Sequence, residues 1–215
     1  MSEALRYRRS VVVDKAVVAR NLALLKERYG ADSFVVWSGR RSGTRFLDGF
    51  RTIADEMAVT VLDSAEEPEF EIRLNQILGG HPELRCAVSL ETHLLSVRTA
   101  AKGDGVSYGA TFVAPEDMRV GLAPVGFADG IDRKLSGHLR VTVGGVEVPV
   151  IGRIAMDSIS LDLRGAPGAT VGDVVSVYGN LRSGDWSIRD AADALGILPV
   201  EIITRLSERA EVVWR

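Results

Sequence analysis

Three glycine-rich phrases stand close together between Val106 and Asp157: VSYGATF (106–112), PVGFADGIDRKL (124–135) and VPVIGRIAMD (148–157). Glycines gather where the backbone turns tightly or approaches another group closely. Between the second and third phrases, 139–143 and 146–151 alternate apolar and polar residues around Gly144-Gly145, which predicts a β-hairpin. One tyrosine, Tyr108, lies among these glycines and is the first candidate functional residue.

The rest of the second half predicts more short strands, at 96–101, 159–163, 173–178 and 209–214. Ser187 and Asp190 have the spacing of a capping box, and Pro199 suits the first turn of a further helix. Many short strands with regular turns indicate a small β-barrel or sandwich.

The first half predicts alternating strands and helices, which is typical of βαβ units and a parallel sheet. Strands are expected at 11–13, 33–37 and 58–62, and helices at 14–28, 46–57 and 70–78. We therefore expect an α+β chain with a boundary near Leu95: a shortened α/β part over 1–95 and a β-domain over 96–215. The loop Gly39-Arg40-Arg41-Ser42-Gly43 is either an anion cradle or a solvent-exposed turn.

Composition and charge argue against several classes of partner. The chain has 215 residues and a formal charge of −3, which argues against a nucleic-acid partner. The single cysteine, Cys86, cannot form a disulfide within the chain, and no apolar run approaches the ~18 residues of a membrane span. The three histidines lack metal-ligand spacing. We expect a cytoplasmic protein without a membrane or metal partner.

The three phrases, in this order, resemble the alanine racemase family. VSYGAT matches the phrase that carries the catalytic tyrosine of that family, GFADG matches GYADG, and GRIAMD matches GR-x-x-MD. The likeness covers roughly the last 120 residues. It implies a β-barrel-type C-terminal domain, an isologous homodimer, and a two-base racemisation of an amino acid held on pyridoxal phosphate.

The resemblance also implies roles for single residues. Tyr108 would be the second base, contributed across the dimer interface. Met156 would contact the substrate carboxylate, Arg133 and Arg153 would line the path of the substrate, and Asp157 joins these binding residues.

The first 95 residues depart from the family pattern. A complete (β/α)8 barrel takes ~200 residues or more, so we expect only a truncated remnant of one. Where the Schiff-base lysine should follow a strand, the chain has Trp37, which cannot form an imine. Two tyrosines of the family are replaced by Phe127 and Glu208. From these departures we expect no cofactor and no autonomous racemase activity.

Three functions remain open. The chain could be a non-racemase that keeps a dimer-interface pocket around Tyr108 for a small amino-acid-like or carboxylate ligand. It could be a repurposed enzyme without pyridoxal phosphate that uses Tyr108 as acid and base. It could also be a partner subunit that donates Tyr108 and Met156 to a full-length alanine racemase.

Overall fold

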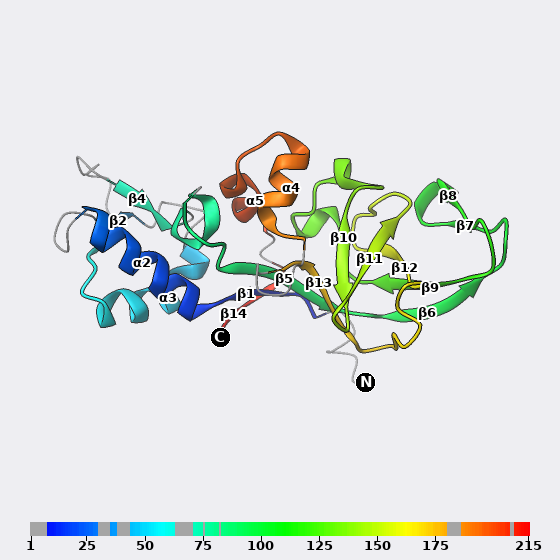
Figure 1. Ribbon diagram of the computed structural model, residues 1–215, viewed down its shortest axis with the longest axis horizontal. Helices are drawn as coiled ribbons and strands as arrows, with labels where there is room; N and C mark the ends of the chain where they lie inside the picture. Colours follow the sequence, from blue (N-terminus) through cyan, green and yellow to red (C-terminus); the bar gives the residue numbers. More distant parts are fainter. Residues whose placement is uncertain are drawn as a thin grey trace.

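A computed structural model describes residues 8–29, 35–37, 44–62, 71–74, 76–81, 83–179, 186–206 and 209–215. Its largest feature is a curled, half-barrel sheet of nine strands (Figure 1). In spatial order these strands are β14 (Glu211–Trp214), β1 (Ser10–Val13), β5 (Val88–His93), β13 (Val174–Tyr178), β10 (Arg140–Val143), β11 (Val146–Ile151), β12 (Ile159–Asp162), β9 (Met118–Ala123) and β6 (Ser96–Ala100). The expected α+β fold is confirmed, and the described residues form no complete (β/α)8 barrel.

The expected hairpin is present. β10 and β11 pair antiparallel with Val143 opposite Val146, and the turn between them is Gly144-Gly145. Both glycines have positive φ, 57° and 86°, which is the requirement of a two-residue turn that matches the twist of the strands. Local sequence therefore sets the register of this part of the sheet.

A smaller α/β region lies at one end of the molecule (Figure 1). It consists of α2 (Lys15–Tyr29), β2 (Val35–Trp37), α3 (Thr44–Glu56), β3 (Val61–Leu62), β4 (Glu71–Arg73) and a π-helical turn, η1 (Gln76–Gly80). β3, β2 and β4 form a parallel three-stranded sheet in the order β3-β2-β4. The prediction of parallel βαβ units is confirmed for these strands.

Two expectations for the first half were wrong. The strand at 11–13 does not join the parallel sheet, because β1 pairs with β14 and β5 in the large sheet. The expected helix at 70–78 is replaced by β4 and η1, because Glu71–Arg73 pair along β2. In both cases strand pairing over long sequence distance overrides the local pattern. The division at residue 95 remains a prediction, although β1 and β5 place part of 1–95 in the large sheet.

Two further helices cover the middle of the large sheet: α4 (Ile188–Leu195) and α5 (Pro199–Arg205). The predicted capping box opens α4: the amide of Asp190 donates to Ser187, and the amide of Ser187 donates to Asp190 Oδ2 at 2.7 Å. One hydrophobic core runs from α2 and α3 into the sheet, so both regions share buried contacts. A second, smaller core lies under the β7–β8 hairpin (Gly105–Val106 and Phe112–Val113).

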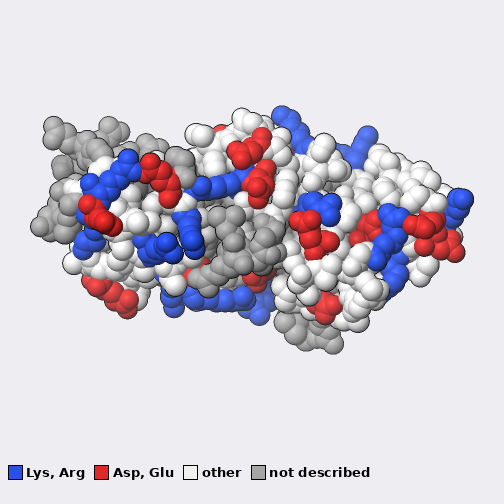
Figure 2. All heavy atoms as spheres, in the orientation of Figure 1, with Lys and Arg blue, Asp and Glu red and all other residues white. Residues whose placement is uncertain are grey.

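Among the described residues, no helix is long and apolar enough to cross a membrane. On the face drawn in Figure 2, basic and acidic side chains are interspersed over the described surface and form no extended patch of one sign.

Candidate functional site

Tyr108 lies on a strained loop. It begins the 3-10 turn η2 (Tyr108–Ala110), between the two strands of the β7–β8 hairpin. Two non-glycine residues beside it have positive φ: Ser107 with φ 69° and ψ 177°, and Ala110 with φ 49°. Such conformations cost about 1–3 kcal/mol each and persist where the surroundings enforce them, commonly at functional sites. The Tyr108 side chain is 68% exposed.

The third phrase holds this loop in place. The hydroxyl of Ser107 donates to the carbonyl oxygen of Arg153 at 2.6 Å. Gly152, with φ 69°, lies so close that a Cβ there would be 2.4 Å from the Cβ of Ser107. Only glycine fits this contact, so the VSYGATF and GRIAMD phrases are packed directly against each other.

The second phrase docks on the third through its backbone. The amide of Phe127 donates to the carbonyl of Ala155, and the amide of Ala128 to that of Met156, both at 3.0 Å. A Cβ at Gly126 would lie 2.2 Å from the Ala155 oxygen, so the two loops could not approach as closely with any other residue. We call residues 106–112, 126–130 and 152–157 together the Tyr108 wall.

A charge network lies behind the wall. Asp129, whose side chain is fully buried, ends the short helix η3 (Phe127–Asp129) and accepts from the amide of Gly126 at 2.9 Å. Its carboxylate is 3.1 Å from Nε of Arg9, which is also buried, and 3.7 Å from Nε of Arg209. Arg209 also donates to Asp157 at 2.6 Å. Hydrogen bonding to Asp157, with the charge of Asp129, raises the pKa of Arg209.

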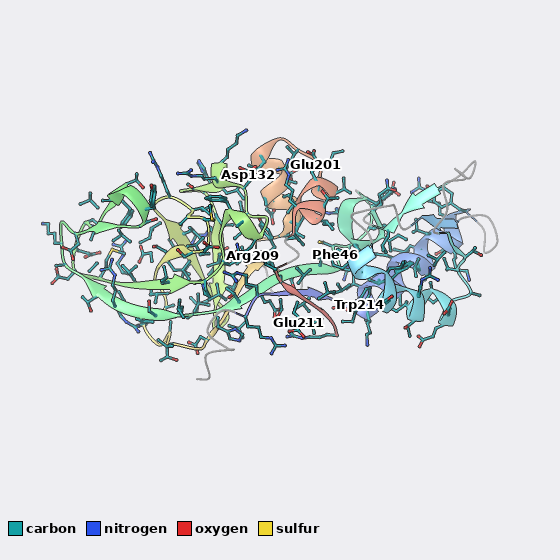
Figure 3. The ribbon with its side chains drawn as sticks, turned by 180° about the vertical axis from the view of Figure 1, so that it is seen from behind. Phe46, Asp132, Glu201, Arg209, Glu211 and Trp214 are labelled. Carbon is teal, nitrogen blue, oxygen red and sulfur yellow. The ribbon has the colours of Figure 1, made fainter. Side chains whose placement is uncertain are left out.

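Figure 3 shows Arg209 near the middle of the molecule, between the sheet and the α5 helix. Through its contacts with Asp129 and Asp157, Arg209 connects the C-terminal segment of the chain to the wall. The sequence placed Arg209 only at the start of the expected strand 209–214 and gave no role to Arg9 or Asp129. The sequence carries no local signal for this pair, since Arg9 and Asp129 are 120 positions apart.

Four of the predicted site residues, Tyr108, Arg153, Met156 and Asp157, are on the wall, and Arg133 contacts it. Met156 is 55% exposed, and the guanidinium of Arg133 stacks over the ring of Phe127 with 5.8 Å between its carbon and the ring centroid. Arg153 is exposed and contributes its carbonyl to the Tyr108 loop, while Asp157 is held by Arg209. The contacts place all five residues on connected loops; their proposed roles in binding and catalysis stay predictions.

A pocket of about 380 Å³ opens beside Tyr108. Its walls are Ser96, Arg98, Ser107, Tyr108, Val120, Gly121, Leu122, Ala155, Ser158 and Ser160. The lining combines four serines with apolar residues and contains one cation, Arg98. Sequence reasoning missed Arg98 and these serines, because their strands are adjacent only through the order of the sheet.

Several predicted features lie apart from the wall or outside the described residues. The Gly39–Gly43 loop, Glu208 and the side chain of Trp37 are outside them; the backbone of β2 ends at Trp37. Cys86 is buried, and burial raises the pKa of its thiol to about 11. Within the described residues no group of three or more His, Cys, Asp or Glu side chains could hold a metal ion.

Comparison with known proteins agrees with the resemblance. The family described as "Alanine racemase, C-terminal domain" matches residues 87–214. The alanine racemase of Piscirickettsia salmonis is 35% identical over 133 residues, which are 62% of this chain and 78% of that protein. The alanine racemase of Mycobacterium ulcerans is 37% identical over 133 residues, which are 61% of this chain but 33% of that protein.

Solved structures show the same fold. The alanine racemase of Streptomyces coelicolor A3(2) superposes with a TM-score of 0.73 at 18% identity and covers 99% of both chains. That of Bartonella henselae, solved "with covalently bound pyridoxal phosphate", gives a TM-score of 0.60 at 20% identity, over 95% of this chain and 66% of the other.

These comparisons correct the expectation that no cofactor is involved. That expectation rested on Trp37 standing where the resemblance places a lysine. The relatives are alanine racemases, and the Bartonella henselae protein carries the cofactor covalently. One substituted position in an α/β region that the family match does not include is too little to exclude pyridoxal phosphate from the function of the chain.

Proposed function

This chain belongs to the alanine racemase family through its C-terminal domain, and we propose that its Tyr108 wall is one half of a site for a small amino-acid-like or carboxylate ligand. In this proposal a second subunit completes the site across a two-fold interface, and Tyr108 is the acid or base that exchanges a proton with the ligand. The observation that carries the proposal is the exposed Tyr108 on a strained loop that three motifs hold rigid.

The geometry supports acid–base work in two ways. A general acid or base must be held within hydrogen-bond reach of the proton that it moves, so a rigid loop is an advantage. The Ser107 hydrogen bond and the close contact at Gly152 supply that rigidity. An exposed phenol also has to be desolvated before it can act efficiently, and a covering subunit would do this.

The wall also suits an anionic ligand. Arg133, stacked over Phe127, and Arg153 are both exposed, so their guanidinium groups can meet a carboxylate. Arg209, by contrast, is engaged by Asp157 and Asp129. We therefore expect Arg133 and Arg153, and not Arg209, to guide a carboxylate towards Met156 and Tyr108.

Pyridoxal phosphate, when bound, acts as an electron sink that stabilises a carbanion next to the amino group. The described wall fits the acid–base part of such chemistry but not covalent attachment, since the residues that line the Tyr108 pocket include no lysine. Among the chain's four lysines, Lys26 donates to the carbonyl of Met57 at 2.5 Å in the α/β region. None of the four lysines is on the Tyr108 wall, so the wall itself offers no lysine for covalent attachment of the cofactor.

A second candidate follows from the same exposure. Tyr108 at 68% and Met156 at 55% project from their own fold, as residues that serve another chain would. A complete alanine racemase could be that other chain, and this protein would then donate Tyr108 and Met156 to it. The two candidates differ only in which polypeptide completes the site, so one experiment can separate them. For either, we expect the cytoplasm as location.

The test measures exchange of the α-proton of L- and D-alanine in D₂O by NMR, with and without added pyridoxal phosphate. The chain is assayed alone and mixed with a complete alanine racemase whose own catalytic tyrosine has been replaced by phenylalanine. Exchange by the chain alone supports a self-completed site. Exchange only in the mixture supports the donated one.

Tyr108→Phe should lower either rate by about 10²- to 10⁴-fold, the usual contribution of a general acid or base. The matched control is Tyr29→Phe on α2, which removes a hydroxyl far from the wall and should leave the rate unchanged. Light scattering at micromolar concentration should show a dimer. A monomer with no exchange in any mixture and no ligand binding would contradict the proposal.

A further inference from the structure

The pocket beside Tyr108 is built on one face of three neighbouring strands. Ser96 of β6 is opposite Leu122 of β9, and Leu122 is opposite Ser160 of β12. Arg98 is opposite Val120 in the next row. Side chains two residues apart on a strand point to the same face, so the serines and Arg98 share one surface. Residues of the other face, such as Leu161 and Val97, pack into the main core.

Arg98 is the single charged group of the pocket. The lining contains no carboxylate, and within the described part of the chain no Asp or Glu forms an ion pair with Arg98. The acid on the same face of β12, Asp162, is engaged by Arg164 at 2.7 Å. Arg98 is therefore free to meet an anion from outside the chain.

Neighbouring arginines show the contrast. Arg119 of β9 donates to the carbonyls of Pro167 and Ala169, and Arg140 of β10 pairs with Glu147. Each of these guanidinium groups is used to fix a loop or a strand pair. Arg98 has no such structural use among the described residues, although it stands on a strand of the same sheet.

The hydroxyls of the pocket are also available. Among the described residues, the side chains of Ser96, Ser158 and Ser160 take part in no hydrogen bond, whereas Ser107 donates to Arg153. A guanidinium with several hydroxyl donors is a set of groups that binds a carboxylate through charge-assisted hydrogen bonds. The volume of about 380 Å³ lies at the small end of ligand sites, which span about 300–1,000 Å³, and leaves room for more than a methyl side chain.

We propose that the ligand of the Tyr108 wall is a dicarboxylic amino acid, whose side-chain carboxylate is bound by Arg98 and the pocket serines. The proposal rests on the function proposed above and adds the class of ligand. The reacting end of the ligand faces Tyr108, and the second carboxylate lies in the pocket. An uncharged side chain of the same size would leave Arg98 without a partner, so the pocket selects for the charge.

The test compares glutamate, glutamine and alanine as ligands of the full chain, by calorimetry or by NMR shifts of the Tyr108 ring, in the dimeric concentration range. Glutamate and glutamine have nearly the same shape and differ in the side-chain charge. We expect glutamate to bind at least tenfold more tightly than glutamine, as one charge-assisted, bidentate contact predicts. Arg98→Gln should remove this preference.

The matched control is Arg140→Gln, which removes the same charge from an exposed arginine outside the pocket and should keep the preference. If alanine binds but glutamate and glutamine bind equally, or if Arg98→Gln keeps the preference, the dicarboxylate inference is overturned while the proposed function stands. If none of the three amino acids binds, both are overturned.

Discussion

The Tyr108 wall and the α/β region of the same chain are held together by different interactions. The wall is fixed by backbone hydrogen bonds between loops, by glycines in close contact, and by a buried carboxylate between two arginines. The α/β region is fixed mainly by apolar side chains such as Leu22, Phe46 and Phe50, which belong to the main core. Figure 3 shows Phe46 and Trp214 near the boundary and Arg209 on the side of the wall.

This difference has a physical meaning. Apolar contacts are non-directional and tolerate substitution if volume is kept, whereas polar networks demand one geometry. A surface that has to hold a tyrosine at a fixed place gains from the second kind of interaction. The α/β region, with strands of two or three residues, needs only to bury its apolar surface.

The largest effect should come from Asp129→Ala. It removes the carboxylate of the buried Arg9–Asp129 ion pair, and breaking a buried ion pair costs about 3–5 kcal/mol. Urea unfolding followed by circular dichroism measures the loss. Asp157→Ala removes an exposed carboxylate that also contacts Arg209 and should cost at most about 1 kcal/mol. Equal losses would contradict the assignment of the wall to its buried network.

The α/β region should respond to lost apolar volume. Leu22→Ala on α2 creates a cavity in the core and should cost about 2–5 kcal/mol of unfolding free energy. Because the core is continuous from α2 to the large sheet, we expect one unfolding transition for both regions. Leu24→Ala, on the same helix but 42% exposed, should change stability by less than about 0.5 kcal/mol. Two separate unfolding transitions in calorimetry would contradict a shared core.

Gly152→Ala tests the contact that holds the Tyr108 loop. The new methyl group would clash with Ser107, and alanine would have to adopt a φ of 69°. We therefore expect a loss of about 1–3 kcal/mol of unfolding free energy. Gly145→Ala has a similar strain, with φ 86°, but meets nothing within 4 Å. Chemical denaturation measures the loss of unfolding free energy for both variants, and the difference between them is the cost of the clash with Ser107. Equal losses would show that the loop moves to accommodate the methyl group.

Asp162 offers a test through pH. Burial raises the pKa of its carboxyl and hydrogen bonds from Arg164 lower it, with a net value below the ordinary one. A lowered folded pKa stabilises the protein above the unfolded value of about 3.9, and this contribution is lost as the pH falls through the folded pKa. Asp162→Asn should therefore cost about 1 kcal/mol at pH 7, and this cost should shrink as the pH falls through the folded pKa. A loss that does not change with pH would assign the effect to packing.

The smallest effect concerns Cys86, which lies between the two regions. Its thiol is buried with a pKa of about 11, so at pH 8 it should not react with a disulfide reagent on the time scale of minutes. Absorbance of the released thiolate measures the reaction, and urea should make the same cysteine react at once. Fast labelling of Cys86 in the native protein would show that the contact between the α/β region and the large sheet opens under native conditions.

The sequence by itself determined those parts of the fold that depend on near neighbours in the chain. Gly144-Gly145 and the alternation around it predict the β10–β11 hairpin, and Ser187 with Asp190 predicts the start of α4. The three motifs also identified the family and the loop that carries Tyr108. These signals are local because turns, caps and glycine conformations depend on a few consecutive residues.

Only the tertiary structure decided what brings distant segments together. It places β1 beside β14, with Ser10 opposite Glu211, and β4 beside β2 where a helix was expected. It also buries Asp129 between Arg9 and Arg209, and aligns Ser96, Arg98 and Ser160 in one pocket. Strand order and buried charge pairs depend on contacts between residues far apart in the chain, and no short stretch of sequence encodes them.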